Sequence, residues 1–149
     1  MAGSSGYDLF LSHAWRFHDD WSRFSDMLTR TAGFAWRNFS LPWHDPAMHA
    51  NTEVGGRFIR DFLERQIIPA QAVVLLAGVH AIDSARVWVE LEVDMARKRH
   101  IPVIGVPPFG ELHVPEKVRE LCDAVCGWSA AELVGAIQQL ESRPAVSNT

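Results

Sequence analysis

The chain has 149 residues, of which 48% are hydrophobic and 21% charged, and its 18 acidic and 14 basic side chains give a formal net charge of −4. This is the size and composition of one globular domain, and it excludes an intrinsically disordered chain. A slightly acidic balance without a run of Lys and Arg disfavours DNA or RNA as a partner, and no apolar stretch approaches the roughly 18 residues that a membrane span needs.

The first elements of the chain predict a strand, a helix, a strand and a long loop. Residues 7–12 (YDLFLS) alternate bulky groups and end in a polar cluster, which is typical of a strand that runs into a loop. Residues 34–39 (FAWRNF) form the second strand candidate, and residues 40–51, with two prolines, form a loop long enough to be functional. Between the strands, spacings of four, three and four predict a helix whose apolar stripe is Phe17, Trp21, Phe24 and Leu28.

The middle of the chain predicts a helix over residues 53–66, a strand over 72–77 and a helix over 84–99. The strand, AVVLLA, is an unbroken apolar run, which indicates burial on both faces of a parallel sheet. Ser84 can cap the second of these helices, whose basic C-terminal end suits the helix dipole. Its inward row is predicted to be Val87, Leu91 and Met95.

The last third predicts a strand at 101–106, a short helix at 115–122, a short strand at 124–128 and a helix that Ser129 caps and that ends near Glu141. Strands that alternate with helices in this way predict a parallel sheet with helices on both faces, and ligands at the carboxyl ends of the strands. We expect Ser12, Trp36, Gly78 and Gly105 at or near that edge. We also expect one domain over residues 7–141, with a flexible N-terminus (1–6) and a disordered tail (142–149).

Several kinds of site lack their sequence signature. The chain has no P-loop, no G-x-G-x-x-G after the first strand and no G-x-S-x-G. The seven histidines show no metal-ligand spacing, so no metal is expected, and Cys122 and Cys126 are expected to be reduced and structural. Residues 1–6 have no basic n-region or apolar h-region, so we expect a cytoplasmic protein.

Glu92 is the most unusual acidic residue of the sequence. Its neighbours one helical turn away are Trp88, Val89, Met95 and Ala96, so no basic side chain is placed to pair with it, whereas Glu90 has Arg86 at four residues. Two interpretations remain open. Glu92 either reaches water or a distant Arg, or it lies beside an indole in a cleft, where a carboxylate with a shifted pKa is a candidate for catalysis.

Two loop segments are further candidates for a site. Ser12, His13, Ala14 and Trp15 leave the carboxyl end of the first strand, where an ordinary helix entry is the alternative. His44 and Asp45 lie in the long loop, where a local hydrogen-bonded turn is the alternative.

The segments YDLFLSHAW, FAWRNFSLPWHDP and SARVWVELEVDMARKRHIPVIGV together resemble the TIR-like proteins of bacterial antiphage Thoeris systems, over Tyr7 to about Gly110. Trp88-x-x-x-Glu92 is similar to the motif around the catalytic glutamate of NAD-cleaving TIR enzymes. The resemblance implies a flavodoxin-like three-layer sandwich with a five-stranded parallel sheet, and NAD as substrate rather than as a cofactor. It implies Glu92 as the catalytic residue and a substrate site in the matched segments, at Ser12, His13, Ala14, Trp15, Trp36, Asn38, His44, Asp45 and Trp88.

The function that the resemblance implies is an NAD glycohydrolase or ADP-ribosyl cyclase type of enzyme, whose cyclic or conjugated ADP-ribose product signals to a separate effector protein. Self-association on activation is implied as well. The first alternative is a TIR-like interaction module without activity, which acts through the loop at residues 40–51. A receiver-like regulator is disfavoured because no acidic pair directly follows the first strand; Asp19 and Asp20 fall in the predicted helix.

Overall fold

The computed structural model of the chain describes residues 6–12, 19–38, 61, 64–80 and 83–141, with the backbone alone at 79–80 and 83–88. Within these residues one sheet contains five strands, with bounds β1 (Tyr7–Leu11), β2 (Trp36–Asn38), β3 (Ala72–Leu76), β4 (Val103–Val106) and β5 (Ala124–Val125). Their spatial order is β2-β1-β3-β4-β5, and every neighbouring pair is parallel. This is the flavodoxin-like order, so the predicted fold class is confirmed.

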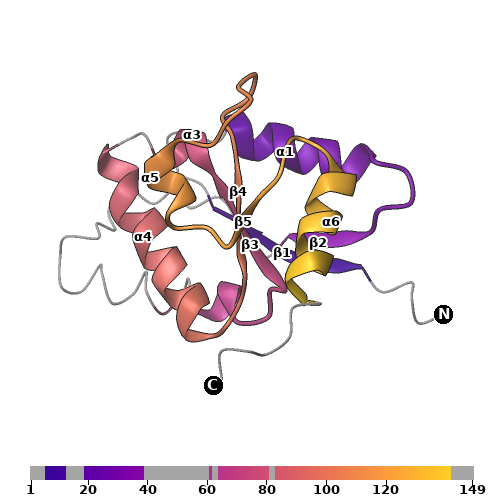
Figure 1. The fold of residues 1–149 in the computed structure, drawn as a ribbon. Coiled ribbons are helices and arrows are strands. Elements are labelled where there is room, and N and C mark those ends of the chain that lie inside the picture. The colour runs from indigo at the N-terminus through magenta and orange to yellow at the C-terminus, as the bar shows by residue number, and fades with distance from the viewer. Residues whose placement is uncertain (1–5, 13–18, 39–60, 62–63, 81–82, 142–149) are drawn as a thin grey trace.

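The helices lie on both faces of this sheet, which makes the three layers (Figure 1). On one face lie α1 (Asp19–Arg30) and α6 (Ala130–Glu141), and on the other lie α4 (Asp83–Lys98) and α5 (Glu116–Arg119). A single turn, α3 (Ala77–His80), follows β3 directly. Residues 61 and 64–67 are helical within or next to the helix predicted at 53–66, and the other residues of that prediction lie outside the described part of the chain, as does the loop at 40–51.

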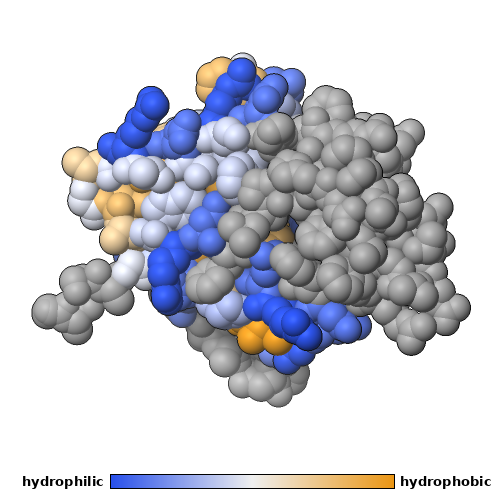
Figure 2. Space-filling view, turned by 180° about the vertical axis from the view of Figure 1, so that it is seen from behind, coloured by the Kyte–Doolittle hydropathy of each residue, from blue (hydrophilic) through white to orange (hydrophobic). Residues whose placement is uncertain are grey.

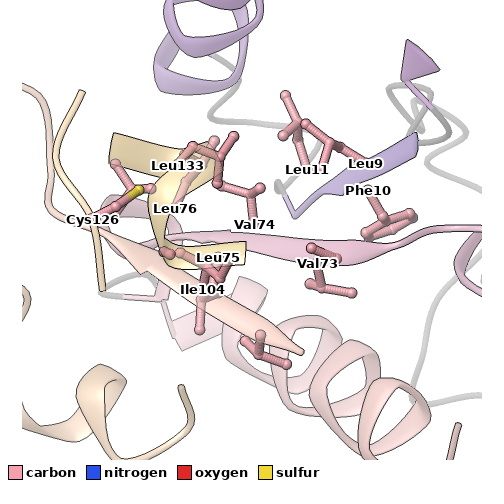
Figure 3. Close-up of a cluster of buried hydrophobic side chains, with 14 of the residues drawn as sticks. Leu9, Phe10, Leu11, Val73, Val74, Leu75, Leu76, Ile104, Cys126 and Leu133 are labelled. Carbon is pink, nitrogen blue, oxygen red and sulfur yellow. The ribbon is translucent and has the colours of Figure 1, made fainter. Parts of the chain in front are cut away.

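The core forms because the central strands are apolar on both sides. All five residues of β3 are buried, as its unbroken apolar run predicted, and all four residues of β4 are buried as well. Figure 3 shows how the side chains of β1 alternate: Leu9 and Leu11 point toward α1, whereas Phe10 points to the opposite side of the sheet. The sheet is thus the middle layer of one hydrophobic core.

Helix α1 buries part of its predicted apolar stripe, in which Trp21 is only partly buried, and helix α6 follows its predicted cap. In α1, Phe24 and Leu28 are buried, and two acidic residues in the first turn and Arg30 in the last suit the helix dipole. In α6, the Ser129 hydroxyl accepts a hydrogen bond from the backbone N–H of Glu132 at 3.2 Å, which confirms the predicted cap. Phe17, the first residue of the predicted α1 stripe, lies outside the described residues.

The structure corrects the rotation of α4. The buried side chains are Val89, Glu92, Val93 and Ala96, whereas Leu91 and Met95 of the predicted inward row are only partly buried. Apolar residues occupy more than one row of this helix, so periodicity alone could not decide which row meets the sheet. The small or β-branched side chains of Val89, Val93 and Ala96 are the apolar residues that this helix buries. The helix also begins at Asp83, one residue before the predicted cap Ser84.

The described part of the surface carries few large apolar side chains. Seen from behind in Figure 2, the described part of the molecule is mostly hydrophilic or neutral, with separate small orange groups. Among the described residues, no helix combines the length and the apolar character needed to cross a membrane.

Candidate active site

The topology brings several loops to one edge of the sheet. Because all strands are parallel, the residues that follow β1, β3 and β4 meet at the carboxyl edge, where α/β sheets bind ligands. Ser12 comes directly after β1 and Gly78 lies two residues beyond the end of β3, while Gly105 is the third of four residues in β4. The predicted places of these three residues are therefore confirmed.

Ser12 closes the pairing of β1 with β3. Its backbone N–H donates to the carbonyl oxygen of Val74 at 2.8 Å, and its Oγ accepts from the backbone N–H of Leu76 at 3.2 Å. The side chain thus takes the place that a strand carbonyl would fill, which is why a fully buried hydroxyl is stable there. Among the described residues, no group accepts a hydrogen bond from the Ser12 hydroxyl.

Glu92 lies on the face of α4 that packs against the core, and its residue surface is only 3% exposed. Its Oε1 atom is buried and has no hydrogen-bond partner among the described residues. The alternative in which Glu92 reaches water is therefore wrong. Glu90, two residues away, is exposed as the sequence predicted.

Burial raises the pKa of the Glu92 carboxyl well above its ordinary value, because the ionised form loses its hydration. A buried carboxyl oxygen without a hydrogen-bond partner lowers the stability of the folded protein, so its presence needs an explanation. Such groups are characteristic of functional sites.

Ser12 and Glu92 are the two polar or charged side chains that are buried in the described part of the chain. Both were predicted as site residues, one from its place at the end of a strand and the other from its apolar neighbours. The core otherwise consists of hydrophobic side chains, so these two positions are where chemistry other than packing can take place.

Trp36 does not belong at this edge. It is the first residue of β2 and pairs with Tyr7, the first residue of β1, so it lies at the amino end of the strands. Its indole N–H donates to Thr29 Oγ1 at 3.2 Å. The predicted place at the carboxyl edge is wrong because the strand begins at Trp36 rather than at Phe34, which makes Asn38 its last residue.

Of the remaining predicted site residues, only Asn38 and the backbone of Trp88 lie in the described part of the chain. Asn38 ends β2, at the carboxyl side. The backbone of Trp88 is in α4, one turn before Glu92. Five others lie outside the described residues: His13, Ala14, Trp15, His44 and Asp45.

One cluster at the carboxyl edge was not predicted. Asp20, in the first turn of α1, accepts a hydrogen bond from the backbone N–H of Phe109 at 3.3 Å. Its Oδ2 lies 3.1 Å from the position that a Cβ atom would take at Gly78, so only glycine fits there without displacement. Asp20 therefore links α1 to the segment after β4 and lies close to the start of α3. The helix dipole already explains an acidic residue in the first turn of a helix, so nothing in the sequence pattern marks Asp20 as a contact across the fold.

A comparison with known protein families identifies the family of this chain. The model of the family described as Thoeris protein ThsB, TIR-like domain, matches residues 10–111. The matched part runs from β1 to the segment after β4 and includes both Ser12 and Glu92. No match was found among curated proteins. Because the match spans more than half of the chain, this protein belongs to the family of Thoeris ThsB TIR-like domains.

Proposed function

We propose that this protein cleaves NAD at the bond between nicotinamide and ribose and releases a cyclic or conjugated ADP-ribose signal for a separate effector. Family membership supports a role in antiphage defence. The observation that carries the proposal further is Glu92, a buried carboxyl with an unpartnered oxygen in the helix position of the W-x-x-x-E motif.

The reaction needs little from the protein. In NAD the nicotinamide ring is cationic, so when the bond from its nitrogen to ribose C1′ breaks, the electron pair neutralises the ring. No general acid is required. The positive charge moves to the ribose, where an oxocarbenium-like transition state forms and a nucleophile then bonds to C1′ and loses its proton. A single carboxylate near C1′ stabilises that charge, as one of the two carboxylates does in glycosidases.

Burial explains how the carboxylate of Glu92 would interact strongly enough with the developing positive charge. An unscreened carboxylate interacts with a nearby cation far more strongly in an apolar site than in water. Burial raises the pKa of the free carboxyl. The positive charge that develops on the ribose would favour the ionised form of Glu92 in the transition state.

The other contacts are assigned from their places in the fold. The Ser12 hydroxyl, which accepts from the Leu76 N–H, would donate its proton to a hydroxyl or phosphate oxygen of NAD at the carboxyl edge. We retain His13, Ala14, Trp15, Asn38, His44, Asp45 and Trp88 as proposed contacts, and we leave out Trp36, which lies at the amino ends of the strands. Indole walls would exclude water and thereby favour capture of the sugar by an internal nucleophile.

The test is to incubate the purified protein with NAD and to identify the products by mass spectrometry. The reaction is run with and without an added small nucleophile, at low and high protein concentration, since we propose self-association on activation. Nicotinamide together with a cyclic or conjugated ADP-ribose is the expected result. Free ADP-ribose as the sole sugar product would still support the cleavage of NAD, but it would refute the proposal that the product is a cyclic or conjugated signal. No loss of NAD under any of these conditions would favour a non-catalytic interaction module that acts through residues 40–51.

A further inference from the structure

A groove that the proposed reaction does not use lies at the carboxyl ends of β4 and β5. It has a volume of about 590 Å³ and lies between residues 107–114 and residues 125–128, with Arg119 and Glu132 also in its lining. This volume lies in the range of small-molecule sites. Of the four large apolar side chains that are exposed in the described part of the chain, three line this groove: Phe109, Leu112 and Val125.

Phe109 is exposed and yet firmly held. Its residue surface is 57% accessible, although its backbone N–H is bonded to Asp20. The guanidinium of Arg23 lies 4.7 Å from the centre of its ring, and the ring packs edge-to-face on Trp128 at 5.1 Å. Trp128 is fixed in turn by a 2.9 Å hydrogen bond from its indole N–H to the carbonyl oxygen of Pro107. The ring is therefore held by two contacts, with Arg23 and with Trp128, and it stays exposed, so it offers a stacking surface.

The polar groups of the groove are of both signs. One oxygen of Glu132, Oε1, accepts from the backbone N–H of Gly127 at 2.8 Å, which fixes the carboxylate and leaves its second oxygen for another donor. Arg119 is exposed and lines the same groove. Glu111 and His113 also line the groove, and Arg119 is the one Lys or Arg side chain among the described residues of its lining.

We propose that this groove binds a nucleoside monophosphate. The base would stack on Phe109, the ribose hydroxyls would donate to Glu132, and the single phosphate would pair with Arg119. An aromatic face, a carboxylate for a diol and one cation for a phosphate are the three recognition elements of such a molecule. The site involves neither Ser12 nor Glu92, so it does not depend on the proposed NAD cleavage.

The test is a titration of the full chain with adenosine 5′-monophosphate, followed by the backbone amide NMR signals of Gly110 and Gly127. Both amides should shift and saturate. Phe109→Ala should weaken binding about tenfold or more, whereas Phe109→Tyr, which keeps the ring, should bind like the wild type. Ile68→Ala, an exposed apolar residue outside the groove, is the matched control and should change nothing. Thermal melts report whether each variant is folded.

A second experiment tests the proposed contact between Arg119 and the phosphate. Adenosine should bind more weakly than adenosine 5′-monophosphate, and Arg119→Gln should remove that difference. The proposal is overturned if the two glycine amides do not move, if they move equally in Phe109→Ala, or if only residues near Ser12 and Glu92 respond. Equal affinity of the wild type for nucleoside and nucleotide would refute the role of Arg119.

Discussion

Replacing Glu92 with Gln tests whether this carboxyl is desolvated, independently of any activity. The two side chains have nearly the same size, but Gln cannot ionise. The pKa of Glu92 in the folded protein is raised by burial, while in the unfolded chain it returns to about 4.3. Between these two values the unfolded state ionises and the folded state keeps its proton. The folded state then binds more protons, so the stability of the wild type falls as pH rises through this window.

The size of the effect follows from that difference. Each pH unit within the window lowers the unfolding free energy of the wild type, relative to Glu92→Gln, by about 1.4 kcal/mol. For a domain of this size, this is a relative change in Tm of about 3–6 °C per unit. Thermal melts of both proteins at pH 4, 5, 6 and 7 measure it, with the exposed Glu90→Gln as control, which should follow the wild type. A Tm difference between wild type and Glu92→Gln that stays constant from pH 4 to 7 would refute the desolvation of Glu92.

Three further predictions concern the edge, the core and the long loop. Ser12→Ala leaves the buried N–H of Leu76 without its acceptor, so the unfolding free energy in urea should fall by about 1–3 kcal/mol; no change would contradict the assigned hydrogen bond. Gly105→Ala would place a Cβ atom 2.7 Å from Cys122 Sγ, and should destabilise the protein by about 1–3 kcal/mol, with Cys122→Ala relieving part of the loss; equal losses in the single and double variants would refute the clash. Residues 40–51 should exchange their amide hydrogens faster than β3 in the empty protein and slow down when NAD is added; protection equal to that of β3 without ligand would count against a role for this loop.

The arrangement of the sheet was predictable because burial on two faces leaves a strong pattern. The five buried residues of β3 form an apolar run without a polar break, and such a run fits only the middle of a helix-covered sheet. Glu92 was predictable for a related reason. A solvated helix face places opposite charges one turn apart, as around Glu90, and Glu92 lacks such a partner.

The errors arose where tertiary packing, and not local pattern, decides. The rotation of α4 depends on which apolar row fits the sheet, and this is a matter of side-chain shape. The short helix α3 begins at Ala77, which an apolar run assigns to the strand before it. Trp36 fell on the opposite edge because a strand boundary shifted by two residues, and in a three-residue strand such a shift exchanges its two ends.

The most direct test of the account is the rate of nicotinamide release by wild type, Glu92→Gln and Glu90→Gln under conditions in which the wild type is active. If the carboxylate of Glu92 stabilises charge that develops only in the transition state, Glu92→Gln should lower turnover by about a hundredfold or more, which corresponds to about 2.7 kcal/mol, with NAD binding nearly unchanged. Glu90→Gln should remain within about twofold of the wild type, because a change on the exposed face touches no reacting group. Full turnover by Glu92→Gln, or loss of turnover in Glu90→Gln instead, would contradict the proposed mechanism.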